Sequence, residues 1–280
     1  FGKNILGWET YGQYRLSGFF RDELIVGAFI TKIFILYFLF YYKSGYNKTF
    51  FNKFFLPLLI IVNFIVFASG ERSAFLHIII FSILVIIASD KELLIVSKLK
   101  IFMIFIILFT SVIFIDGDIK HRMIDHTFNQ LKEKTIPFLP YTVHHEEHYR
   151  SALTMFKDKP IVGHGSGLFR FLCEDDKYYF NSLSCSTHPH NFYIQLLAEN
   201  GILGLLIPLI FYLFIIKIFF TQLYQKNFKK EKFNINILIS SMGLIVYLWP
   251  IIPTMDFFNQ WSNIPLFIAL TSRDSLIFGT

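Results

Sequence analysis

Long apolar runs leave this chain few ways to fold. Six of them stand out, and they cover Leu24–Tyr42, Phe54–Ser69, Ser73–Ser89, Leu99–Ile115, Phe192–Phe220 and Ile235–Ile252. A helix needs about 20 apolar residues to cross a bilayer, with a lower limit near ~17. Backbone groups in lipid must pair internally, and continuous runs without period-two alternation favour helices over a barrel. The runs therefore predict an all-α polytopic membrane protein.

A seventh stretch, Ile264–Phe278, is weaker because Arg273 and Asp274 interrupt it. We expect it to form a short or re-entrant helix at most. The expected number of transmembrane helices is therefore about six or seven.

The composition excludes several other classes of protein. Hydrophobic residues make up 54% of the chain and charged residues 16%, whereas a soluble domain carries about 25% charged residues. The 36 phenylalanines exclude a disordered chain, because disordered chains are poor in aromatic residues. The net charge of +6 does not indicate a nucleic-acid partner, because the lysines gather in short clusters between the apolar runs. The chain begins at Phe1, and we expect it to be the C-terminal part of a longer protein.

The distribution of basic residues predicts which side of the membrane each loop occupies. Three short loops that topology places on one side contain ten lysines: Lys43, Lys48, Lys53, Lys91, Lys98, Lys100, Lys226, Lys229, Lys230 and Lys232. The short loop on the other side, around Gly70, contains only Arg72. Basic loops face the cytoplasm, so residues 1–23, 116–190 and 253–263 are predicted to face the periplasm of a bacterial inner membrane.

This topology divides the chain into three parts. Residues 1–115 hold a periplasmic N-terminal segment and the first four spans, residues 116–190 form one large periplasmic loop, and residues 191–280 hold the C-terminal spans. The loop contains eight of the nine histidines, and long loops of this kind are usually functional or disordered. Its aromatic content and its Pro and Gly residues favour a folded, functional loop. Cys173 and Cys185 both lie in it, and in an oxidising compartment a structural disulfide is favoured over free thiols.

Several polar residues of the outer side are candidates for a site. Arg72 lies in the turn Ser69–Ser73. The alternative to a functional role for it is a contact with lipid headgroups or a pair with Glu71. Arg150 opens a short amphipathic helix that ends before Pro160, and it is alternatively an ordinary solvated residue. Pro189 suits a helix start, which puts His190 in the first turn of the fifth span, where it would otherwise only cap the helix.

Further candidates lie in the glycine loop and inside the spans. The stretch 160–169 has glycines at 163, 165 and 167, which permit backbone amides to approach a ligand closely. Glu199 is a polar residue two to three turns into the fifth span, where such residues usually face protein or water. Lys32 lies in the middle of the first span. A functional role is favoured for it equally with the alternative, which is snorkelling to the surface or a pair with another span.

The order of these features resembles the O-antigen ligase and O-antigen polymerase superfamily of bacterial inner membranes. The features are Arg72 in an outer turn, Arg150, the pattern Pro160-x-x-Gly-x-Gly-x-Gly-x-Phe169, and His190-Asn191 leading into Glu199-Asn-Gly201. The stretch Arg15–Gly27 is also similar to the segment before a family span. The resemblance implies a larger protein with a GT-C-like helical membrane fold. It also implies transfer of a glycan from undecaprenyl diphosphate to an acceptor hydroxyl on the periplasmic side.

The resemblance also implies a role for each candidate residue. Arg72 and Arg150 would hold the diphosphate, because a guanidinium binds phosphate oxygens bidentately and stays charged. They would stabilise the developing charge as a metal ion does elsewhere, so neither a metal nor another cofactor is expected. His190 would accept the proton of the acceptor hydroxyl, and Glu199 would orient a polar partner. Further substrate-binding candidates are Arg15, Arg21 and Lys32.

Two other classes of function compete with this interpretation. His144-x-x-Glu-His148 matches a zinc-peptidase pattern whose ligands must lie on a helix. We expect no helix before Tyr149 and find no third ligand, so a solvated cluster is favoured. A transporter or flippase of lipid-linked glycans would show internal repeats and interrupted spans, whereas the polar residues here gather on one membrane face. The acceptor stays open, since lipid A–core would make the protein a ligase and a second lipid-linked repeat unit would make it a polymerase.

The predicted topology can be tested with reporter fusions. A reporter inserted in the lysine cluster 226–232 should be cytoplasmic, and one inserted beside Glu147 should be periplasmic, because basic loops are retained inside. Labelling of the two sites from the opposite compartments would put the candidate residues on the wrong side for this chemistry.

Overall fold

The computed structural model describes residues 15–20, 23–43, 54–88, 106, 110, 117–132, 142–229, 233–258 and 263–264. These residues form helices and no strands, in agreement with the predicted all-α class. In chain order the elements are α1 (Val26–Lys43), α3 (Leu56–Ala68), α4 (Arg72–Ala88), α6 (Asp118–Lys120), the π-helix η2 (His121–Asp125), α7 (His126–Lys132), α8 (Val143–Asp158), α9 (Phe169–Leu172), α10 (Phe192–Phe228) and α11 (Ile235–Tyr247).

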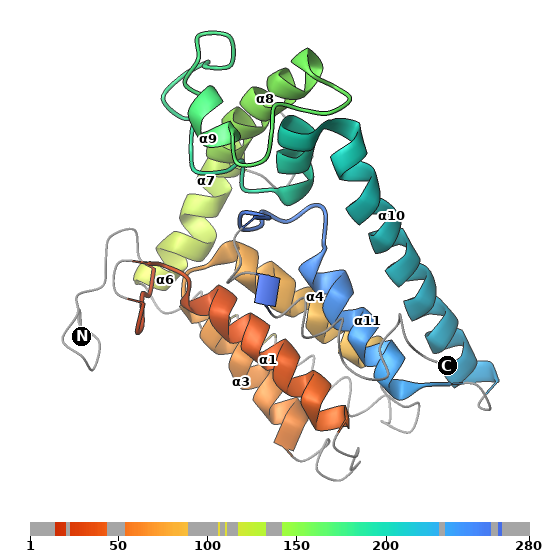
Figure 1. Cartoon of the computed structure of the whole chain (residues 1–280). Coiled ribbons are helices and arrows are strands. Elements are labelled where there is room, and N and C mark those ends of the chain that lie inside the picture. Colours follow the sequence, from red (N-terminus) through yellow and green to blue (C-terminus); the bar gives the residue numbers. More distant parts are fainter. Residues whose placement is uncertain are drawn as a thin grey trace.

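The apolar helices α1, α3, α4 and α11 pack side by side, and α10 lies against α11 at an inclined angle (Figure 1). Aromatic rings fill the centre of this bundle. The ring of Phe38 lies 4.6 Å from that of Phe55 and meets that of Phe81 edge to face at 5.3 Å. One polar contact is buried with them, in which the Asn63 amide donates to Ser82 Oγ at 2.9 Å. The core is thus mainly apolar, and the Asn63 amide nitrogen in it is paired.

One described helix, α10, is long and apolar enough to cross a membrane. A break at Gly201 divides it, and the arm formed by residues 202–228 extends over about 40 Å. The other apolar helices are shorter. A proline lies in the first turn of α3, and α11 ends at Tyr247, before Pro250. The structure therefore supports the predicted class, a helical membrane protein, but the described residues do not show the predicted number of about six or seven spans. The runs 99–115 and 264–278 lie almost wholly outside the described residues.

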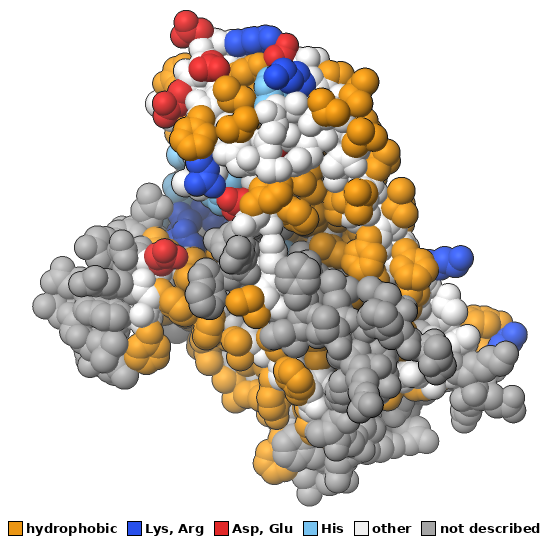
Figure 2. Space-filling model, viewed as in Figure 1, with side chains coloured by type: hydrophobic (Ala, Val, Ile, Leu, Met, Phe, Trp, Pro, Cys, Tyr) orange, Lys and Arg blue, Asp and Glu red, His pale blue; other side chains and the backbone are white. Residues whose placement is uncertain are grey.

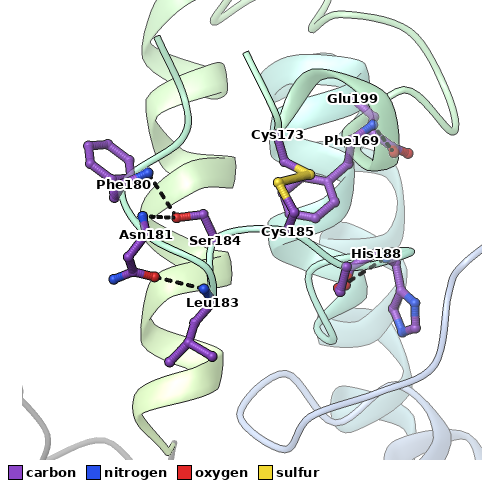
Figure 3. The surroundings of a disulfide bond; sticks show 10 residues. Phe169, Cys173, Phe180, Asn181, Leu183, Ser184, Cys185, His188 and Glu199 are labelled. Carbon is purple, nitrogen blue, oxygen red and sulfur yellow. Dashed lines mark hydrogen bonds between the residues drawn. A yellow bond between two sulfur atoms is a disulfide. The ribbon is translucent and has the colours of Figure 1, made fainter. Parts of the chain in front are cut away.

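The segment between α4 and α10 forms a small cap on the bundle, at the end where α8 and α9 lie (Figure 1). Its own core contains Ala152, Met155, Phe169 and Tyr178. The predicted disulfide between Cys173 and Cys185 is confirmed, and it adjoins this core (Figure 3). A fold with so few buried residues benefits from such a covalent link.

Helix α8 is longer than the sequence predicts. It ends before Pro160 as expected, but it begins at Val143, so the expectation of no helix before Tyr149 is wrong. The reason is a capping box, in which the side chains of Thr142 and His145 each accept a hydrogen bond from the other residue's backbone. The histidine pattern 144–148 therefore lies on a helix. Among the described residues, however, no group of three or more His, Cys, Asp or Glu side chains is placed to hold a metal ion.

Helix α10 is broken at Gly201, and the glycine loop fills the break. Gly201 has φ 65° and ψ −163°, values that suit glycine. The carbonyls of Ala198 and Glu199 accept from the amides of His164 and Gly165, at 3.2 and 2.7 Å. In the other direction, the amides of residues 202 and 203 donate to the carbonyls of residues 160 and 161, at 2.8 and 3.4 Å. We call residues 160–169 with 198–203 the clasp.

The clasp explains why the glycines and Glu199 occur together. A Cβ atom at Gly163 would lie 2.3 Å from the backbone carbon of Glu199, so no larger residue fits there. The Glu199 carboxylate accepts from the amides of Gly167 and Phe169, at 2.9 and 3.0 Å. The loop amides therefore donate hydrogen bonds to carbonyl and carboxylate groups of α10 beside the break. The expectation that they face a ligand is wrong for the amides of residues 164, 165, 167 and 169.

Alanine at position 163 should destabilise the protein. It would collide with the α10 backbone and occupy φ +67°, and we expect a loss of at least about 2 kcal/mol in the free energy of unfolding. Gly117→Ala is the matched control, since a Cβ there would meet nothing within 4 Å. Thermal melting in detergent measures both, and equal melting temperatures would contradict the clasp.

Candidate functional site

A cavity of about 1060 Å³ separates the bundle from the cap. Its volume suits a drug-sized or larger ligand. The wall combines the ends of α1, α4 and α11, the helices η2 and α7, the start of α8, and the segments before α10 and after α11. Its charged and histidine side chains are Arg15, Lys32, Glu71, Arg72, His77, Arg122, His126, His144, His145, His148, His188, His190 and Asp256. Lys, Arg and His side chains are visible in the recess between cap and bundle (Figure 2).

Three arginines line one end of this cavity. The guanidinium of Arg72 donates to Gln130 Oε1 at 2.7 Å and to Thr127 Oγ1 at 3.2 Å, which ties the start of α4 to α7. Arg122 donates to the carbonyl of Gly70 at 3.5 Å from η2. Burial lowers the pKa of Arg122, and the charge of Arg15 lowers it further. Neutral acceptors hold Arg72 and Arg122 in place, and among the described residues no carboxylate forms an ion pair with either guanidinium, as an anion site requires.

Glu71 organises this end of the cavity. Its buried carboxylate accepts from the amides of Gly27 and Ala28, at 2.5 and 3.2 Å, and so caps the start of α1. It also lies 3.9 Å from the guanidinium of Arg15. Burial raises the pKa of Glu71, while the two amides and Arg15 oppose that rise. The predicted alternative of a pair between Glu71 and Arg72 is wrong, since Glu71 pairs with Arg15.

Four histidines meet at another part of the cavity wall, which the start of α8 and the segment before α10 form. The ring of His190 lies 4.3 Å from that of His188, 5.4 Å from that of His148 and 5.8 Å from that of His145. Burial, and then the neighbouring histidines, lower the pKa of His190 to about 3. Burial likewise lowers the pKa of His145 to about 4. These rings are therefore neutral near pH 7, which is the form that accepts a proton.

His190 has an unusual backbone. Its φ is +58°, a region that costs a non-glycine residue free energy and often marks a functional position. The helix begins at Phe192 with Asn191 as its N-cap, so His190 precedes the helix, and its predicted place in the first turn is wrong. The Thr254 amide donates to the His190 carbonyl at 2.7 Å, and Thr254 Oγ1 accepts from the Phe192 amide at 2.9 Å. The segment after α11 thus fixes the ring.

A buried chain of polar groups joins this segment to the clasp. The Gln195 amide donates to Asp256 Oδ1 at 2.7 Å and to Glu199 Oε2 at 3.2 Å. Arg170 pairs with Asp256 at 3.1 Å. Glu199 is therefore tied to the cavity through Gln195 and does not line it. Sequence reasoning missed Gln195, Thr254 and Asp256, because their roles come from contacts between distant segments.

The cavity brings together four of the seven predicted site residues: Arg15, Lys32, Arg72 and His190. Arg21 lies outside the described residues. Arg150 is not part of the wall. It lies two residues after His148, about 200° around α8, and its guanidinium stacks 3.9 Å from the centre of the Phe180 ring. Arg122 occupies the place in the arginine cluster that the sequence interpretation gave to Arg150.

A family model described as O-antigen ligase matches residues 55–209. The matched region includes Arg72, Arg122, the histidines of the cavity and the whole clasp. Arg15, Lys32 and Asp256 lie outside it. No match was found among curated proteins.

The histidine cluster should make stability depend on pH. The folded protein keeps His145 and His190 neutral down to about pH 4 and 3, whereas an unfolded histidine binds a proton near ~6.5. Stability should therefore fall as the pH falls below about 6.5, by up to ~1.4 kcal/mol per pH unit for each histidine. Melting temperatures between pH 7.5 and 5 measure the slope, and His145→Gln should flatten it. A slope unchanged in that variant would contradict the low pKa of His145.

Proposed function

Since the chain belongs to the O-antigen ligase family, a family of bacterial membrane enzymes of polysaccharide biosynthesis, we propose that it transfers a glycan from undecaprenyl diphosphate to an acceptor hydroxyl on the periplasmic face of the inner membrane. The observation that carries this proposal is one cavity whose wall contains both a partly buried arginine cluster and a cluster of neutral histidines. The two clusters match the two parts of the reaction, a diphosphate that leaves and a hydroxyl that attacks.

The arginine cluster suits the leaving group. As the bond between the anomeric carbon and the phosphate oxygen breaks, its electron pair passes to that oxygen, and the diphosphate leaving group gains one negative charge. Arg72 and Arg122 present guanidinium groups to such a charge, and Arg15 and Lys32 add to the positive potential. Four basic and two acidic side chains line the cavity among the described residues. A partly buried site with a net positive charge stabilises the negative charge that develops in the transition state.

The histidine cluster suits the acceptor. The hydroxyl oxygen forms the new bond to the anomeric carbon, and its proton passes to the neutral ring of His190. A base with a pKa of about 3 is weak, but a bound diphosphate would bring negative charge into the cavity and raise that pKa. Donor binding would therefore prepare the base. His145, His148 and His188 keep the ring desolvated and in place.

The acceptor is the hydroxyl of lipid A–core or of a second lipid-linked repeat unit. Both bring a sugar hydroxyl to the same histidines, so the cavity serves a ligase and a polymerase equally. The basic loops 43–53, 91–100 and 226–232 would lie in the cytoplasm and leave the cavity open to the periplasm.

The division of labour can be tested in nanodiscs with purified lipid-linked donor. Arg72→Lys keeps the charge but loses the paired hydrogen bonds, so transfer should slow about 10²-fold or more. His190→Ala should slow transfer about 10²–10⁴-fold and leave donor affinity nearly unchanged, because the base acts on the acceptor. Lys157→Ala, at an exposed position of α8, is the control.

The results separate the proposed roles. A fully active Arg72→Lys variant would remove this arginine from diphosphate binding. If His190→Ala lost donor affinity as severely as transfer, the histidine would bind the donor instead of activating the acceptor. Movement of the intact lipid-linked glycan across the bilayer, with no transfer to any acceptor, would favour a flippase.

A further inference from the structure

The outer surface of the clasp is strongly apolar. Ile161 and Val162, at the turn of the glycine loop, are 62% and 65% exposed. Nearly two thirds of each side chain thus has no contact within the described residues. Two such residues in sequence at a loop tip are costly in water, since each leaves apolar area unburied.

The main chain ties this loop tip to the start of the long arm of α10. The amide of Leu203 donates to the carbonyl of Ile161 at 3.4 Å, and the amide of Ile202 donates to the carbonyl of Pro160 at 2.8 Å. Gly201 packs so closely that a Cβ atom there would lie 2.3 Å from the carbonyl oxygen of Ile161. The loop tip and Leu203 therefore form one continuous surface.

That surface continues along α10. Leu203, Ile207, Ile210 and Phe214 follow one another at helical spacing, and their side chains are 54%, 75%, 62% and 48% exposed. Figure 2 shows hydrophobic side chains along the edge that α10 forms and onward toward the cap. Because α10 is long and apolar enough to cross a membrane, this exposed stripe faces hydrocarbon.

The length of α10 places the loop tip at the edge of the bilayer. The apolar run of α10 ends at Phe220. Leu203 precedes Phe220 by 17 positions, which is about 26 Å along the helix axis. The hydrocarbon core is about 30 Å thick, and an average tilt of about 20° shortens the helix only slightly along the membrane normal. Leu203 and the adjoining loop tip thus lie in the outer part of the hydrocarbon, just below the headgroups.

We propose that Ile161 and Val162 insert into the outer leaflet, so that the clasp anchors the cap to the lipid surface. The occupant of this apolar face is the acyl-chain region just below the headgroups. Insertion keeps the cavity at the height of the headgroups, which is where the diphosphate of a lipid carrier lies. The anchor concerns the position of the cap and does not depend on the chemistry of transfer.

Depth-dependent quenching tests this anchor. Single cysteines introduced as Ile161→Cys or Val162→Cys are labelled with an environment-sensitive fluorophore, while Cys173 and Cys185 stay paired. The full chain is placed in phosphatidylethanolamine–phosphatidylglycerol nanodiscs that contain lipids brominated at shallow or at deep acyl positions. Both labels should lose intensity, and more with the shallow bromines than with the deep ones. Neither label should respond to iodide in the water.

Two further labels calibrate the measurement. A label at Ile207→Cys, one turn farther along the exposed stripe, should respond more to the deep bromines. A label at Asn181→Cys, on an exposed loop of the cap, should respond to iodide and to neither lipid. Melting temperatures equal to that of the unlabelled protein show that each variant is folded.

Two results would overturn the proposal. If the labels at 161 and 162 behaved like the label at 181, the loop tip would lie in water. If they responded neither to brominated lipid nor to iodide, another part of the protein would cover the apolar face. Both readouts are independent of catalysis, so a failure of the proposed transfer reaction would leave this test intact.

Discussion

The backbone hydrogen bonds across the break in α10 hold the molecule's two parts together. A helix that stops at Gly201 and resumes leaves carbonyls and amides unpaired, and a buried unpaired group costs free energy. The glycine loop supplies the missing partners, and the Glu199 carboxylate holds the end of that loop. Through Gln195 the same carboxylate reaches Asp256 and the segment that fixes His190. The position of the histidine therefore depends on the break in the helix.

Charge is separated along the cavity. Arg72 and Arg122 are held by neutral acceptors, whereas Arg15 has a buried carboxylate beside it. The histidines of the cavity wall are kept neutral by burial. In the proposed reaction, a diphosphate bound at the arginines would increase the proton affinity of the histidines. Donor binding and the strength of the base would thereby be coupled.

Sequence patterns predicted the parts of this structure that depend on neighbours along the chain. The apolar runs predicted helices, and Pro160 predicted the end of α8. The presence of Cys173 and Cys185 in one loop on the oxidising side of the membrane predicted the disulfide. Arg72 and His190 were predicted as a site, and the cavity contains both. Arg122 carried no signal, since no motif surrounds it and only tertiary packing brings it beside Gly70. Arg150 was misplaced because a motif fixes order along the chain but not the face of a helix.

The positive φ of His190 has a consequence for how this protein can change. A glycine at this position would adopt the same backbone without strain, and it would remove a buried ring that resists protonation. In the proposed function, the cost in stability at this position is the cost of keeping a proton acceptor. Random substitution with selection for heat resistance alone would tend to replace the histidine, whereas selection for glycan transfer would keep it. Position 190 is thus one at which the two demands oppose each other.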